Sequence, residues 1–77
     1  MEKKNFELKR FRRVGDIVNS FLSEGYVLRI RSNSVALIFV KMQHQRNGNY
    51  ITIKSTERDI TIFKNQKQVH HETCNYN

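Results

Sequence analysis

Residues 35–64, VALIFVKMQHQRNGNYITIKSTERDITIFK, decide the fold of this 77-residue chain. Apolar and polar residues alternate along this stretch with a period of two, and β-branched and aromatic residues are frequent, both typical of strands. Asn47-Gly48 is a strong hairpin signal, because a type I′ turn needs two residues at positive φ. A second turn falls at Glu57-Arg58. The pattern predicts strands over residues 35–45, 49–55 and 59–64.

A helix is predicted upstream, over residues 6–24, where apolar residues recur every three or four positions. Asn5 is the expected N-cap and Gly25 the expected C-terminal stop. Gly15 weakens this helix by about 1 kcal/mol relative to alanine, which close packing on a sheet would explain. Residues 26–31 return to a period of two and predict another strand. The expected buried stripe of the helix consists of Leu8, Phe11, Val14, Ile17, Val18, Phe21 and Leu22.

The predicted fold class is α+β: an N-terminal α-helix packed on one face of a four-stranded antiparallel β-meander (αββββ). Short connections favour sequential antiparallel pairing, and the chain length allows one domain. Residues 1–5 form a polar N-terminal segment, residues 6–65 the domain, and residues 66–77 a polar, flexible tail in this prediction.

Register divides the predicted sheet into an inner face, covered by the helix, and an outer face. Cross-strand partners share a face. A two-residue loop at Asn47-Gly48 pairs Met42 with Ile53, and the next turn pairs Ile53 with Ile62. A three-residue loop at residues 32–34 is favoured because it turns the apolar residues of the first strand inward. The predicted inner face comprises Tyr26, Leu28, Ile30, Ala36, Ile38, Val40, Met42, Ile51, Ile53, Ile60 and Ile62.

The outer face is predicted to be basic and aromatic, and a single helix cannot cover it as well. Uncovered apolar side chains of this kind mark partner sites. The residues expected to bind a partner there are Arg29, Arg31, Leu37, Phe39, Lys41, Tyr50, Lys54 and Phe63. The helix is expected to add a basic surface made of Lys9, Arg10, Arg12 and Arg13.

The formal net charge of +7 indicates a polyanionic partner. Aromatic rings on an open sheet stack bases, while Lys and Arg contact phosphates. The sequence therefore predicts a small nucleic-acid-binding protein, with DNA and RNA both open. The alternative is a protein-interaction module acting through the same face, such as a phage or mobile-element inhibitor, or a ribosome-associated or assembly protein. Two copies could also pack their outer faces together as a homodimer.

Several other classes of function are not expected. The chain carries no catalytic motif, so it is predicted to be non-enzymatic and to need no cofactor. His70, His71 and Cys74 lack a fourth ligand and fit no zinc spacing, so no metal site is expected. One cysteine excludes an internal disulfide. No apolar run reaches the ~18–20 residues of a membrane span, and no signal-peptide pattern is present, which favours the cytoplasm.

Overall fold

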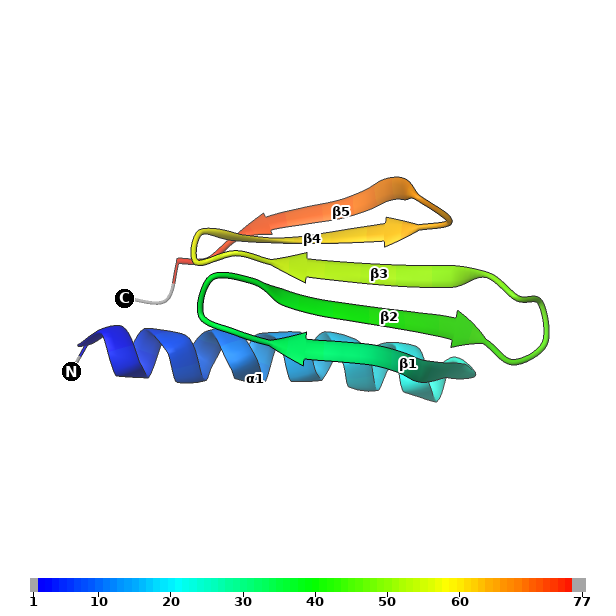
Figure 1. The fold of residues 1–77 in the computed structure, drawn as a ribbon, viewed down its shortest axis with the longest axis horizontal. Helices are drawn as coiled ribbons and strands as arrows, with labels where there is room; N and C mark the ends of the chain where they lie inside the picture. Colours follow the sequence, from blue (N-terminus) through cyan, green and yellow to red (C-terminus); the bar gives the residue numbers. More distant parts are fainter. Residues whose placement is uncertain (1, 76–77) are drawn as a thin grey trace.

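The computed structural model describes residues 2–75, with side chains from residue 5 onward, as one helix followed by an antiparallel meander (Figure 1). The sheet has five strands in the order β1-β2-β3-β4-β5, so the α+β class is confirmed and the expected count of four strands is wrong. The elements are α1 (Glu2–Ser23), β1 (Tyr26–Asn33), β2 (Ile38–His44), β3 (Tyr50–Ser55), β4 (Asp59–Lys64) and β5 (Lys67–Thr73).

The helix begins at Glu2, earlier than expected, so Asn5 lies within it and does not cap it. Its end agrees with the prediction, because Gly25 follows with φ +99° and donates its N–H to the carbonyl oxygen of Leu22 at 3.2 Å. In Figure 1 the long axis of α1 runs along the strands.

The hydrophobic core lies between α1 and the inner face of the sheet. The expected stripe is only partly right, because Leu8 and Leu22 are 55% and 44% exposed. On the sheet, Leu28 and Ile30 are also exposed, and Ala36 lies in a loop. The remaining inner-face residues are buried as predicted. The core consists of Val14, Ile17, Val18, Tyr26, Ile38, Val40, Met42, Ile51, Ile53, Ile60 and Ile62.

The β1–β2 connection is longer than expected. Asn33 pairs with Ile38, which leaves residues 34–37 as the loop. This register alone would turn Tyr26 outward, but an extra residue, Arg29, forms a β-bulge between Leu28 and Ile30. Because one extra residue exchanges the two faces, Tyr26 returns to the inner face, where it is buried.

The β2–β3 connection also differs from the predicted two-residue turn. The His44 N–H donates to the Asn49 carbonyl, which closes a four-residue loop at residues 45–48. Gly48 has φ +73°, whereas Asn47 is not at positive φ. Met42 therefore pairs with Ile51 instead of Ile53. A shift of two residues leaves every side chain on its predicted face.

Strand β5 is formed by part of the segment that was expected to be a tail. Lys64 pairs with Lys67 across a two-residue turn, in which Asn65 has φ 50° and Gln66 φ 70°. Both central residues at positive φ make this a type I′ arrangement without glycine. Asn65 is held by β3, since the Tyr50 N–H donates to its Oδ1 at 2.8 Å and its own N–H donates to the Tyr50 carbonyl at 3.0 Å.

A second β-bulge, on β5, sets which side chains meet the helix. The register shifts between Ile62 and Phe63, so that Ile60 pairs with Glu72 and Thr61 with His71. Glu72 therefore lies on the inner side, where it accepts two hydrogen bonds of 2.8 Å from Arg13 of α1. This bidentate ion pair ties the last strand to the helix.

Replacing Gly15 with alanine should stabilise the protein. A Cβ at Gly15 would meet no heavy atom within 4 Å, so the expected close packing on the sheet is wrong. Gly15→Ala should raise stability by up to about 1 kcal/mol and Tm by roughly 4–8 °C. Circular dichroism during heating measures this. The matched control, Gly25→Ala, should lower Tm, because its φ is +99° and its Cβ would lie 2.9 Å from His44 Nε2. A Gly15→Ala variant that melts earlier than wild type would show that the helix has no room for a side chain there.

Acid should weaken the protein through Glu72. The hydrogen bonds from Arg13 lower the pKa of its carboxyl from 4.5 to about 2. Because the folded value is the lower one, the stabilisation is present above about pH 4.5 and is lost as the pH falls towards about 2. The free energy of unfolding of wild type should exceed that of Glu72→Gln by about 1 kcal/mol at neutral pH. This difference should shrink as the pH falls from about 4.5 towards about 2. Urea unfolding over a pH series checks this, and a difference that does not change with pH would contradict it.

Candidate functional site

The outer face carries lysines and aromatic residues on neighbouring strands, as predicted. Across β2 and β3, Phe39 pairs with Lys54 and Lys41 with Thr52. Thr52 in turn pairs with Phe63 on β4, so these side chains share one face. The helix occupies the opposite face, where the core lies. The outer face is therefore uncovered by any element of the described chain.

The two outer-face lysines lie over aromatic rings. Lys41 Nζ is 4.9 Å from the centre of the Tyr50 ring, and Lys54 Nζ is 5.4 Å from the centre of the Phe63 ring. Each contact is a cation–π interaction between residues on adjacent strands. The contacts hold the ammonium groups close to the sheet, so that charge and ring faces occupy the same surface.

A hollow of about 380 Å³ lies on this face. Phe39 and Lys41 contribute from β2, and Tyr50, Thr52 and Lys54 from β3. Gln66 of the β4–β5 turn completes the lining. The hollow thus combines two rings, two ammonium groups, a hydroxyl and an amide.

The arginines of β1 are placed differently from the prediction. Because the four-residue β1–β2 loop sets the register, Arg31 pairs with Val40 and lies on the helix side, so its expected place on the outer face is wrong. Arg29 is the extra residue of the bulge, and Ile30, which was expected to be buried, pairs with Lys41 instead. Leu37 is 41% exposed but belongs to the β1–β2 loop. The bulge could not be read from alternation alone.

Arg10 does not belong to a binding surface, because its side chain is fully buried. Its Nε donates to Ser55 Oγ at 2.9 Å and its Nη2 to the Ser55 carbonyl at 2.8 Å. Its Nη1 donates to the Val35 carbonyl at 2.9 Å and to Glu7 Oε2 at 2.8 Å. The guanidinium thereby joins the helix to the end of β3 and to the β1–β2 loop. Glu7, three residues before Arg10, is the sequence signal for this pairing.

The other basic residues of the helix also lie away from the outer face. Arg13 is engaged by Glu72, as described above. Lys9 and Arg12 are exposed. Since α1 covers the inner face, its exposed side points away from the hollow. Lys9 and Arg12 therefore do not belong to the same surface as Lys41 and Lys54. The predicted basic cluster is thus divided between structural and exposed positions.

Two contacts between a histidine of β5 and a carboxylate were not expected from the sequence. On the outer face, His71 Nε2 lies 3.0 Å from Asp59 Oδ2, and Thr56 donates to Asp59 Oδ1 at 2.7 Å. These hydrogen bonds, the one from His71 foremost, lower the pKa of the Asp59 carboxyl. His70, the adjacent residue, faces the opposite side and contacts Glu72 at 2.9 Å. The two histidines therefore do not converge, and the described residues include no cluster suited to a metal ion.

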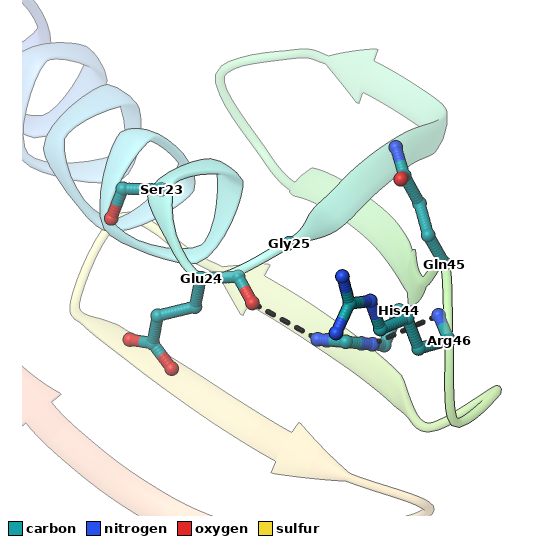
Figure 2. A pocket seen from close by; sticks show the side chains of 6 residues that line it. All are labelled: Ser23, Glu24, Gly25, His44, Gln45 and Arg46. Carbon is teal, nitrogen blue, oxygen red and sulfur yellow. Dashed lines mark hydrogen bonds between the residues drawn. The ribbon is translucent and has the colours of Figure 1, made fainter.

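A second hollow, also of about 380 Å³, lies where the helix meets β1 (Figure 2). His44 lines it with both ring nitrogens engaged. Nε2 lies 2.9 Å from the Glu24 carbonyl, and Nδ1 accepts the Arg46 N–H at 3.1 Å. A nitrogen that accepts an N–H carries no proton, so Nε2 is the donor. His44 thereby connects the C-terminal end of α1 to the loop that follows β2.

Substitution of Arg10 should be far more damaging than substitution of its exposed neighbour. Arg10→Ala leaves Glu7 and the Ser55 carbonyl without their buried partner, which should cost about 3–5 kcal/mol. Arg12→Ala removes the same charge from an exposed position and should change stability by no more than about 0.5 kcal/mol. Urea unfolding of both variants measures the contrast. Similar effects of the two substitutions would refute the structural role assigned to Arg10, which joins the helix to β3 and to the β1–β2 loop.

No helix among the described residues is long and apolar enough to cross a membrane. Comparisons with models of protein families, with curated proteins and with solved structures yield no significant match to this chain. Its function is therefore inferred from its own residues.

Proposed function

We propose that the protein binds nucleic acid through the outer face of its sheet. The observation that carries this proposal is the alternation of lysines and aromatic rings, Lys41 with Tyr50 and Lys54 with Phe63, on a face that the helix leaves uncovered. Ammonium groups neutralise phosphates, and aromatic rings stack with bases. The formal charge of +7 adds a general attraction to polyanions.

The magnitudes favour exchange of the lysines from ring to phosphate. An exposed cation–π contact is worth about 0.5–1 kcal/mol. A base stacked on an aromatic side chain contributes about 1–3 kcal/mol. A base that displaces the ammonium group from a ring therefore gains more than is lost, and the released lysine is left beside the phosphate. The cation–π contacts are therefore too weak to prevent a base from stacking on the rings.

Removing the two outer-face lysines should weaken binding and its dependence on salt. The double variant Lys41→Gln/Lys54→Gln should lose about tenfold or more in affinity. The slope of log affinity against log salt should become shallower by roughly 1.4–1.8, since each of the two lost phosphate contacts contributes about 0.7–0.9 to the slope. Fluorescence anisotropy with labelled oligonucleotides over a salt series measures both quantities.

The matched control removes the same charge from the helix. Lys9→Gln/Arg12→Gln should keep most of the affinity, because these residues face away from the outer face. Equal losses in the two double variants would show that net charge, and not this face, attracts the ligand. Absence of binding by folded wild-type protein at low salt would refute nucleic-acid binding altogether.

A second candidate function, interaction with a protein, is favoured by the apolar residues along β1. Leu28 and Ile30 are 45% and 51% exposed, and Val35 and Leu37 of the adjoining loop are also exposed. Buried apolar side chains are the usual centre of a protein interface. The bulge in β1 interrupts regular pairing along this edge. As the alternative function we propose a protein contact along this edge of the sheet, where Leu28 faces the helix side and Ile30 the outer side.

A further inference from the structure

We infer that the hollow between β2 and β3 is a subsite for single-stranded nucleic acid, with one base on Phe39, another on Tyr50, and the intervening backbone phosphates beside Lys41 and Lys54. This inference rests on the proposed function and adds the form of the strand. All four side chains line the same hollow.

The order of groups along the hollow fits an extended strand. Phe39 and Lys54 form one cross-strand pair, and Gln43 and Tyr50 form another, four residues along β2. Four residues of a strand span about 13 Å. Lys41 and Thr52 form the pair between these two rows. An aromatic ring therefore stands near each end, with an ammonium group and a hydroxyl between them.

This spacing does not fit neighbouring stacked bases of a duplex. Neighbouring nucleotides of one strand in a duplex are about 3.4 Å apart along the axis, far less than the separation of the two backbone rows that carry the rings. Bases within a duplex also present only their edges in the grooves. A single strand can splay its bases and place each on a separate ring.

Gln66 is a second, independent sign that this hollow has a ligand. Its φ of 70° is unfavourable for a residue with a side chain, and glycine would adopt the same turn more easily. Its side chain lines the hollow, next to the turn residue Asn65 that is bonded to Tyr50. A costly backbone conformation at a lining residue points to a use for that side chain. Its amide is suited to hydrogen bonding with the edge of the base on Tyr50.

The test compares three labelled ligands by fluorescence anisotropy: an oligothymidylate, an abasic oligomer with the same number of phosphates, and a duplex of the same length. Wild type should bind oligothymidylate at least about tenfold more tightly than either of the others. Tyr50→Leu should reduce the affinity for oligothymidylate by about 5- to 100-fold. It should leave the abasic oligomer and the slope against salt unchanged.

Gln66→Gly separates binding from folding, because it should raise Tm while weakening binding of oligothymidylate about threefold to tenfold. Gln45→Gly, at an exposed loop position outside this hollow, is its matched control and should not alter affinity. Equal affinities for all three ligands, with no effect of Tyr50→Leu, would overturn the subsite and leave nucleic-acid binding standing. Failure of folded wild type to bind any of them at low salt would overturn both.

Discussion

The buried guanidinium of Arg10 is the interaction on which the arrangement of helix and sheet depends. A charge taken out of water must be fully paired, and here Glu7, Ser55 and the Val35 carbonyl supply the partners. These groups come from α1, β3 and the β1–β2 loop, so the guanidinium fixes all three relative to one another. With the helix held in this position, one face of the meander becomes core, and no element of the described residues covers the other.

The two β-bulges adjust the edges of the sheet to this arrangement. On β1 the extra residue Arg29 brings Tyr26 under the end of the helix, and on β5 the register shift brings Glu72 to Arg13. Both bulges lie on edge strands, where unpaired backbone groups invite pairing with other chains, and a bulge discourages such pairing. The bulges thus complete the core at the two edge strands. The central strands β2, β3 and β4 keep a regular register and an uncovered outer face.

Much of the central sheet follows from the sequence, because alternation fixes which side chains share a face even when a turn is misjudged by two residues. For this reason Phe39, Lys41 and Lys54 lie where the pattern predicts, although the Asn47-Gly48 loop differs. The length of the β1–β2 loop carries no such signal. Its four residues, instead of the expected three, shift the register by an odd number of residues and turn Arg31 to the helix side. Strand β5 is absent from the prediction because its turn places Gln66, and not glycine, at positive φ.

The long-range contacts of the helix also set an order of events as the chain is made. Each hairpin of the meander joins neighbours in sequence and needs only a short loop to close. Arg10 must wait for Ser55, 45 residues later, and Arg13 for Glu72, 59 residues later. During synthesis these two contacts of α1 therefore cannot form until almost all of the sheet has emerged, so the helix, although made before the sheet, is fixed in its final position last.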